Sequence, residues 1–262
     1  MGAVPVAVVT GAAQGIGRRV AETLAERGYA LVLSDLREPA DTLEAVRARS
    51  GATAEPVAVV GDVSSEQYAA QLTQRALDAF GRVDVLVNNA GISLLSPAEQ
   101  TSAALWRRVL EVNLTGPFLL CQALGAAMLA RGAGSIVNIA SIAGLQGVSD
   151  RAAYNASKHG LIGLTRTLAA EWGGRGVRVN AVCPGWVKTE MDAADQASGG
   201  YTDADITERV PMGRFAAPGD IAAAVAFLAD PAVSGFVNGV ALPVDGGWIA
   251  DASWTSLRLR KR

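Results

Sequence analysis

The sequence has one histidine and two cysteines, and this scarcity excludes several kinds of site. A single histidine, His159, cannot by itself form a zinc site or a Ser-His-Asp triad, so the commonest hydrolytic mechanisms are excluded. Cys121 and Cys183 lie far apart and lack the paired spacing of a metal or redox site. We interpret both cysteines as small buried residues and His159 as a partly exposed helix residue, and we expect no metal.

The sequence also lacks an excess of charge and a long apolar run. The formal net charge is −2, which gives no electrostatic basis for binding nucleic acid or an anionic membrane. No apolar run approaches the roughly 18 residues of a membrane span. The N-terminus enters the apolar stretch VPVAVVTG without a charged leader. We therefore expect a cytoplasmic protein with neither nucleic acid nor a membrane as partner.

Short valine-rich segments alternate with longer segments of helical period along the chain of 262 residues. The apolar residues of the short segments are almost continuous, as expected for parallel strands covered on both faces. We predict strands at residues 5–10, 30–35, 56–61, 83–88, 135–140, 177–182 and 240–245. Strands that alternate with helices predict one α/β domain, over residues 1–250, with a doubly wound parallel sheet.

Two segments do not fit this alternation. Residues 186–215 mix acids, small residues and a Gly-Gly pair, and they are too long for a simple connection. We predict a short helical excursion or lid there, with a surface insertion of no role as the alternative. Residues 251–262 form a basic tail that is either a solvated end, or a part of a subunit contact, or an attractor of an anionic substrate.

The first predicted strand runs into the glycine-rich stretch TGAAQGIG, residues 10–17, just before a helical pattern. Glycine lets the main chain turn sharply and approach a diphosphate, and the N–H groups of a helix start attract its charge. The spacing GxxxGxG differs from the familiar GxGxxG, and a tight turn without a ligand is the alternative. At this turn we assign to the cofactor site Gly11, Gln14, Gly15, Ile16 and Gly17.

Asp35 ends the second predicted strand, about 20 residues beyond the glycines. A carboxylate at this position accepts hydrogen bonds from the adenosine ribose hydroxyls and repels the 2′-phosphate of NADP. We therefore predict NAD as the cofactor. Arg37 complicates this prediction, because its guanidinium is close enough in sequence to swing toward a phosphate.

Further polar residues follow the later strands, where an open α/β sheet binds its ligand. Asp62 and Val63 come after the third predicted strand, and the NNAG segment, residues 88–91, comes after the fourth. We expect Asp62 to reach the adenine amino group and Asn89, Ala90 and Gly91 to line the adenosine ribose. Each segment in isolation would also suit an ordinary polar turn.

The stretch YNASKHG places Tyr154 and Lys158 on one face of a predicted helix, because residues four apart lie one above the other. With TGAAQGIG, NNAG, VNLTG, NIASIAG, CPGWVKT and VDGG in the same order, the chain resembles the short-chain dehydrogenase/reductase family over nearly its whole length. The resemblance implies a single Rossmann-type domain with a seven-stranded parallel sheet flanked by helices, usually assembled into dimers or tetramers. It also implies a catalytic set made of Asn113, Ser141, Tyr154 and Lys158.

In this resemblance Tyr154 is the general acid and base of the reaction. A free tyrosine has a pKa of about 10, so a positive charge on Lys158 is needed to favour the phenolate. Lys158 would also bind the nicotinamide ribose, and Tyr154 would contact the cofactor as well. Ser141 would hydrogen-bond the substrate oxygen, and Asn113 would hold a water that links Tyr154 to solvent.

The family pattern also assigns Pro184, Gly185, Val187 and Thr189 to the nicotinamide end of the cofactor. Thr189 either contacts the cofactor or caps the helix that follows. Family geometry further implies a substrate pocket, in which the side chains either grip a polyhydroxylated ring or face solvent. The pocket residues implied are Ser93, Ala143, Gln146, Arg151 and Trp186, together with parts of the 186–215 segment.

The pattern is similar to bacterial enzymes acting on sugars, polyols and related secondary alcohols, and to 3-oxoacyl thioester reductases. Because NAD enzymes more often serve catabolic oxidation, we favour an NAD-dependent dehydrogenase of a secondary alcohol, a sugar or polyol. The alternatives are a reductase of 3-oxoacyl thioesters or of other cyclic or aliphatic ketones, and a non-catalytic NAD-binding sensor or scaffold. The helices predicted around residues 101–130 and 153–172 either form a two-fold interface or cover the sheet of one subunit.

Overall fold

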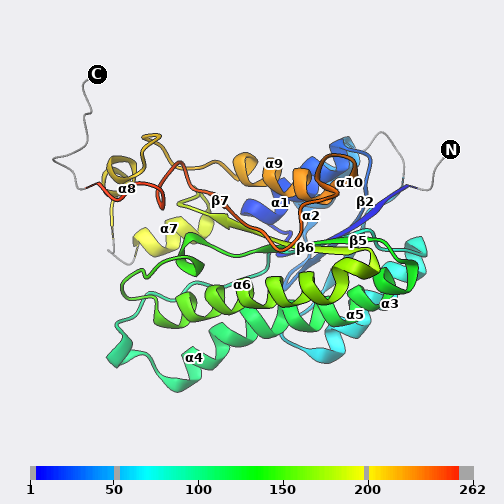
Figure 1. The fold of residues 1–262 in the computed structure, drawn as a ribbon, viewed down its shortest axis with the longest axis horizontal. Helices are drawn as coiled ribbons and strands as arrows, with labels where there is room; N and C mark the ends of the chain where they lie inside the picture. The colour runs from blue at the N-terminus through cyan, green and yellow to red at the C-terminus, as the bar shows by residue number, and fades with distance from the viewer. Residues whose placement is uncertain (1–3, 50–53, 198–200, 254–262) are drawn as a thin grey trace.

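A computed structural model describes residues 4–49, 54–197 and 201–253. One parallel sheet crosses the molecule in the strand order β3-β2-β1-β4-β5-β6-β7 (Figure 1). Its strands are β1 Val6–Thr10, β2 Ala30–Asp35, β3 Val57–Val60, β4 Val85–Asn88, β5 Gly134–Ile139, β6 Val177–Pro184 and β7 Ala241–Val244. This confirms the predicted Rossmann-type doubly wound sheet of seven parallel strands, with strand bounds that lie within two residues of the predicted ones.

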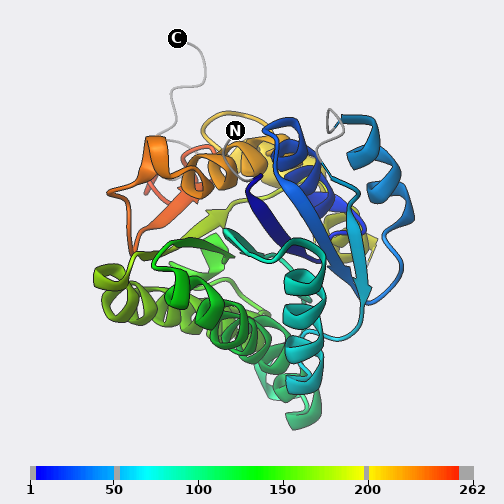
Figure 2. The same ribbon diagram turned by 90° about the vertical axis from the view of Figure 1, so that its right-hand side faces the viewer.

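Helices cover both faces of the sheet (Figures 1 and 2). One face carries α1 Gly15–Glu26, α2 Ala40–Arg49, α9 Pro218–Ala229 and α10 Pro231–Ser234. The other carries α3 Glu66–Phe80, α4 Ala103–Leu110, α5 Gly116–Arg131 and α6 Ala152–Trp172. Short 3₁₀ turns lie at Ala98–Gln100, Ile142–Gly144 and Gly173–Arg175. The predicted excursion contains two short helices, α7 Glu190–Ala197 and α8 Asp203–Arg209, at one end of the molecule.

The two helix layers explain why the strands read as continuous apolar runs. In β1 all five residues are buried. Ala7 and Val9 pack into a core shared with α1 and α9, whereas Val6 and Val8 pack into a second core shared with α3 and α5. Because successive side chains point to opposite faces, a strand with a core on each side has no polar face.

The order of the strands creates the place for a ligand. The chain passes from β1 to β2 and β3 in one direction and then returns to β4 on the other side of β1. The connections after β1 and β4 therefore leave in opposite directions, and open α/β sheets bind ligands in the resulting crevice. The two connections are joined here, since Asn89 and Ala90 donate their main-chain N–H groups to Thr10 Oγ1 at 3.1 and 3.0 Å.

The helical stretch Ala103–Arg131 bears on the expectation that no segment spans a membrane. By length and composition alone this stretch could cross one, with a mean hydropathy of 1.4. Half of its most apolar window is buried in the fold, where α5 contributes Leu120 and Leu124 to the core. A core helix therefore accounts for this composition. A π-helical turn, Glu111–Thr115, separates α4 from α5.

The two cysteines and the single histidine lie in the kinds of environment that the sequence predicts. Cys121 and Cys183 are fully buried free thiols, and burial raises their pKa values to about 12 and about 11. His159 is an exposed residue of α6 whose Nδ1 lies 2.9 Å from the carbonyl of Asn155. The described residues contain no cluster of ligands that could hold a metal ion. Most of the predicted basic tail, residues 254–262, lies outside the described residues.

Candidate active site

A cavity of about 520 Å³ lies at the carboxyl ends of the strands, partly covered by α7. Its wall includes nearly all of the residues that the sequence assigns to a cofactor. Those lining it are Gly11, Gln14, Gly15, Ile16, Asp35, Asp62, Val63, Asn89, Ala90, Gly91, Tyr154, Lys158, Pro184, Gly185, Val187 and Thr189.

The glycine turn between β1 and α1 has the main-chain geometry that a diphosphate cradle requires. Gly11 and Gly15 have φ angles of +64° and +56°, in the region that favours glycine. A Cβ on Gly17 would lie 2.0 Å from the carbonyl oxygen of Gly11. Gly17 is therefore required for the close packing of α1 on the turn and stands behind the cavity wall. Gln14, at the N-cap of α1, makes no side-chain capping bond, so the turn suits an anionic group.

Asp35 and Arg37 stand together at the end of the cavity near β2. Asp35 accepts a hydrogen bond from the main-chain N–H of Ala13 through Oδ2 at 2.9 Å. Arg37 donates its main-chain N–H to Asp35 Oδ1 at 3.4 Å, and its guanidinium donates to Gln14 Oε1. The guanidinium is thus directed along the turn, while the carboxylate is held by the main chain.

Asp62 has partners that the sequence did not indicate. Its Oδ1 accepts from the main-chain N–H and hydroxyl of Ser64, and its Oδ2 accepts from Arg108 at 2.8 Å. Burial raises the pKa of Asp62, but the bonds from Ser64 and Arg108 outweigh it, and the pKa lies below its ordinary value. Asp62 therefore presents a charged acceptor at the cavity wall, and Arg108 from α4 is a lining residue that was not predicted.

Tyr154 and Lys158 are one turn apart on α6, with the Lys158 ammonium 5.6 Å from the centre of the Tyr154 ring. Lys158 donates to the carbonyl of Ile139 at 2.8 Å, and burial lowers its pKa to about 8. Burial raises the pKa of Tyr154, and the hydrogen bond from Ser141 acts in the opposite direction. The three groups from α6 and the end of β5 therefore form one cluster, with Ser141 and Lys158 buried and Tyr154 half-buried.

Asn113 lies behind this cluster, in the π-helical turn. Its side chain accepts from the main-chain N–H of Ile92 at 2.8 Å and donates to the carbonyl of Ile92 at 2.9 Å. It also donates to Ser157 Oγ at 3.2 Å. These contacts fix the segment after β4 against α6. The side chain is therefore engaged by protein groups, and Asn113 does not line the cavity.

The segment after β6 forms the part of the cavity wall that the resemblance assigns to the nicotinamide. Ala216 donates its N–H to the carbonyl of Trp186 at 2.9 Å, and Lys188 donates its N–H to the carbonyl of Ala216 at 3.1 Å. These bonds hold Val187 at the cavity wall. Thr189 lines the cavity, and its Oγ1 also accepts from the N–H of Asp192 at 3.4 Å in the first turn of α7. The capping interpretation of Thr189 and its position at the cavity are therefore compatible.

The predicted substrate residues divide into two groups. Ala143, Arg151 and Trp186 line the cavity. Ser93 does not, but its hydroxyl contacts Arg151 at 2.7 Å. Gln146 is absent from the wall, and its main-chain carbonyl accepts from Asn155 at 3.5 Å, so its contact with a substrate stays a prediction.

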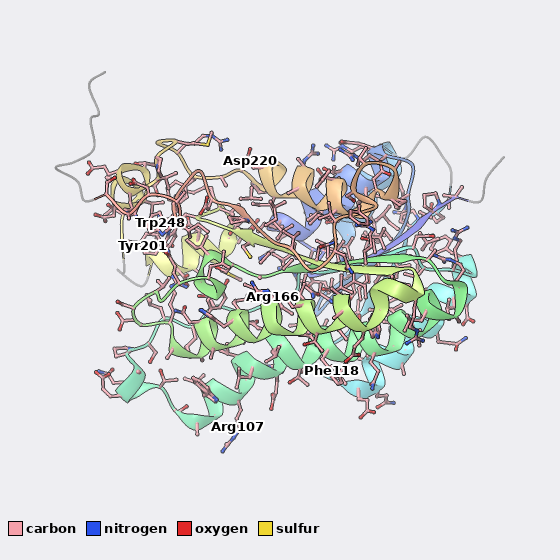
Figure 3. The ribbon with its side chains drawn as sticks, in the orientation of Figure 1. Arg107, Phe118, Arg166, Tyr201, Asp220 and Trp248 are labelled. Atoms are coloured by element: carbon pink, nitrogen blue, oxygen red, sulfur yellow. The ribbon has the colours of Figure 1, made fainter. Side chains whose placement is uncertain are left out.

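The helical insertion contributes one wall of the cavity, as the family resemblance implied, but most of its lining residues were not named individually. These residues are Glu190, Met191, Asp192, Asp195 and Tyr201. Trp186 packs edge-on against Tyr201, with ring centres 4.7 Å apart, and against Trp248 at 5.9 Å. Figure 3 shows Tyr201 and Trp248 near each other at the α7–α8 end. An aromatic cluster therefore flanks the polar groups around Tyr154.

Comparison with known proteins shows that the chain is similar to dehydrogenases and reductases over nearly its whole length. A family model described as enoyl-(acyl carrier protein) reductase matches residues 11–249. A D-threitol dehydrogenase from Mycolicibacterium smegmatis is 44% identical over 247 residues, covering 93% of this chain and 92% of that protein. A cis-4-hydroxycyclohexanecarboxylate dehydrogenase from Sinomonas cyclohexanicum is 44% identical over 246 residues, covering 94% and 96%. The structure of an actinorhodin polyketide ketoreductase solved with NADPH has a TM-score of 0.88 and 38% identity, covering 94% and 97%.

Proposed function

The chain belongs to the short-chain dehydrogenase/reductase family, and we propose that it is an NAD-dependent dehydrogenase of secondary alcohols, specifically of sugars or polyols. The supporting observation is that one cavity joins Asp35 at one end to Tyr154, Lys158 and Ser141 at the other. A dinucleotide has its adenosine and its reactive ring at opposite ends, so one such ligand fits both groups.

The residues of this cavity divide the work of holding a dinucleotide. Gly11, Gln14, Gly15 and Ile16 offer main-chain N–H groups to the diphosphate, and Asp35 accepts from the adenosine ribose. Lys158 holds the nicotinamide ribose, and Val187 holds the carboxamide through its main chain. When bound, the nicotinamide accepts the hydride in oxidation and supplies it in reduction.

Tyr154 moves the proton at the substrate oxygen. In oxidation its phenolate takes the proton of the alcohol, and in reduction its hydroxyl gives a proton to the carbonyl oxygen. Lys158 has a pKa of about 8, so it is mainly protonated at neutral pH, and a cation 5.6 Å from the ring favours the phenolate. Ser141 hydrogen-bonds the same oxygen and stabilises its developing charge. Asn113 fixes the segment after β4 against α6 beside these groups, and we propose that it holds the water of a proton relay to solvent.

NAD rather than NADP is the cofactor that we propose. The Asp35 carboxylate would lie beside a 2′-phosphate, and two negative charges at that distance repel. Arg37 weakens the argument only in part, because Gln14 holds its guanidinium. The ketoreductase solved with NADPH belongs to the same family, so cofactor choice depends on such local charges and not on the fold.

A panel of sugars, polyols, cyclic alcohols and 3-oxoacyl thioesters, with NADH absorbance as the readout, tests the proposed reaction. Tyr154→Phe should lower kcat/KM by about 10²- to 10⁴-fold, because it removes the proton donor and acceptor. The variant should still bind NADH, measured by fluorescence titration. His159→Ala, an exposed change on the same helix, is the matched control and should keep full activity.

Two outcomes would contradict the proposal. Turnover confined to the 3-oxoacyl thioesters would assign the chain to acyl reduction. A Tyr154→Phe variant that keeps full turnover, or a wild type that binds NADH but oxidises none of the alcohols, would favour the non-catalytic sensor.

The family resemblance also leads us to propose a cytoplasmic homo-oligomer, a dimer or tetramer. Support comes from exposed apolar side chains on α4 and α5, where Leu105, Trp106 and Phe118 are 48%, 37% and 43% exposed. Figure 3 shows Phe118 on the outer side of this helix layer. Two copies of this face could bury these side chains in an isologous contact, and light scattering measures the resulting mass.

A further inference from the structure

Arg151 connects the catalytic helix to the helical insertion. Its side chain is 9% exposed. One guanidinium nitrogen donates to Ser93 Oγ at 2.7 Å, and the other donates to Asp195 Oδ2 at 2.7 Å. Ser93 in turn donates to the same carboxylate oxygen at 3.2 Å. The guanidinium carbon lies 5.7 Å from the centre of the Trp186 ring. Arg151 is thus held on three sides by groups from different segments.

The ion pair of Arg151 and Asp195 lies beside Tyr154, the proposed proton donor and acceptor. Arg151 is the N-cap residue of α6, three residues before Tyr154, so the helix that positions the tyrosine also positions the guanidinium. The preceding main chain is anchored, because Ser96 donates its N–H to the carbonyl of Asp150 at 2.7 Å. Arg151, Asp195 and Tyr154 line the same cavity. A substrate whose oxygen is at Tyr154 would therefore meet this pair with its remaining atoms.

The charges at this end of the cavity are balanced. Asp195 offsets Arg151, and the side chain of Asp192, another acid of α7 in the wall, lies 3.3 Å from Lys188 and accepts from the Tyr201 hydroxyl. Beyond burial and the bond from Ser141, the charge of Arg151 lowers the pKa of Tyr154 and that of Asp195 raises it. The pair therefore adds opposing contributions at the catalytic phenol.

We propose that the Arg151–Asp195 pair makes the substrate site select neutral polyhydroxylated alcohols and reject substrates that carry a carboxylate. A guanidinium in a largely buried site would otherwise be a bidentate receptor for such a carboxylate. Here an acid of the same chain already occupies it, and an incoming anion would also be repelled by Asp195. This inference rests on the proposed function, and it distinguishes between the two kinds of substrate that the relatives' names describe.

The test uses pairs of substrates that differ in one group, a neutral CH2OH in one member and a carboxylate in the other. One pair is cis-4-hydroxycyclohexanemethanol and cis-4-hydroxycyclohexanecarboxylate, and the other is D-threitol and its four-carbon aldonate. The wild type should prefer the neutral member by at least tenfold in kcat/KM. Asp195→Asn keeps an acceptor of similar size but removes the charge, so it should lower this preference at least tenfold by raising kcat/KM for the anion. The double variant Arg151→Gln/Asp195→Asn should restore the preference for the neutral member.

Asp203→Asn is the matched control, since it removes one acid and one ion pair from the same insertion outside the cavity. It should leave the preference unchanged. A second readout does not need turnover: cyclohexanecarboxylate should bind the NADH complex of Asp195→Asn, and not that of the wild type, in a fluorescence titration. Melting curves verify that each variant is folded.

Equal or greater wild-type activity on the anion, or a preference unchanged in Asp195→Asn, would overturn the inference while the proposed oxidation stands. If no alcohol is oxidised, the proposed function fails, and the binding titration still decides the inference. Cyclohexanecarboxylate binding equally to both complexes would then refute it.

Discussion

The two ends of the cavity are built from different kinds of structure. The cofactor end is mainly main chain and glycine at the ends of neighbouring strands, where Asn89 Nδ2 donates to the carbonyls of Thr10 and Gly11 at 3.0 and 3.1 Å. The substrate end is made of side chains from separate segments, with Arg151 and Asp195 44 residues apart. Substitutions that alter the backbone should therefore weaken cofactor binding at the first end, whereas substitutions that alter charge should change substrate preference at the second.

Lys158 stands between the two ends, and its replacement should have the largest effect. Lys158→Met should lower kcat/KM by about 10³-fold, because the phenolate of Tyr154 loses its neighbouring cation. The same variant should be more stable than the wild type without cofactor, by about 2 kcal/mol at pH 7, because a buried charge is removed. Thermal unfolding and NADH absorbance measure the two effects.

The pH dependence of that stability gain is a separate check. Burial lowers the pKa of Lys158 from 10.5 in the unfolded chain to about 8 in the folded protein. The unfolded state therefore binds more protons between these values, and wild-type stability rises with pH across this window. The gap between the variant and the wild type should be largest below pH 8 and should narrow toward pH 10.5. A gap that does not narrow, or a variant less stable at pH 7, would contradict the buried-charge explanation.

Gly17→Ala tests the main-chain construction of the cofactor end. Alanine favours a helix by about 1 kcal/mol over glycine, but the new Cβ would lie 2.0 Å from the Gly11 carbonyl oxygen. The clash should dominate and destabilise the protein by about 3 kcal/mol, with weaker NADH binding. Gly219→Ala in α9, whose Cβ would have its nearest neighbour at 3.9 Å, is the control and should be nearly neutral. Unchanged melting and NADH affinity in Gly17→Ala would refute the close-packing role.

Asp35→Ser should have the smallest effect of these three substitutions, and its effect should be confined to the choice between NAD and NADP. Removing the carboxylate removes the repulsion of a 2′-phosphate, while the Arg37 guanidinium keeps its contact with Gln14. The ratio of kcat/KM for NADP over that for NAD should rise at least about tenfold, or about 1.4 kcal/mol. Asp41→Ser, an exposed acid on α2, should leave the ratio unaltered. A clear wild-type preference for NADP would show that Asp35 does not exclude the phosphate.

The fold could be predicted because its signals are local. Strands with a core on both faces are continuous apolar runs, and each predicted strand overlaps an observed one. The extension of β6 to Pro184 was missed, since a proline is an unusual last residue for a strand. The glycine turn was predictable for a similar reason, because its chemistry is contained in eight consecutive residues.

The substrate end could not be predicted to the same degree, because its contacts are between distant residues. The insertion contains the acids Glu190, Asp192, Asp195, Asp203, Asp205 and Glu208, and nothing in their local sequence separates Asp195 from the rest. Asp195 differs from the other acids because it pairs with the guanidinium of Arg151, the N-cap residue of α6. Gln146 is close to Ser141 in sequence, but it does not line the cavity, and its main chain bonds Ile142 and Asn155, so its role toward a substrate stays a prediction.

The Arg151–Asp195 contact also has a consequence for how this enzyme can change over evolutionary time or in the laboratory. Grafting the 186–215 segment of a relative onto this scaffold would exchange Asp195 but leave Arg151 behind on the catalytic helix. Without a matching acid, such a chimera would retain a buried cation next to Tyr154 that lacks its carboxylate partner, which would lower both stability and turnover. The two positions should therefore be inherited as a unit, and a library that varies them jointly should yield more active chimeras than one that varies the loop alone.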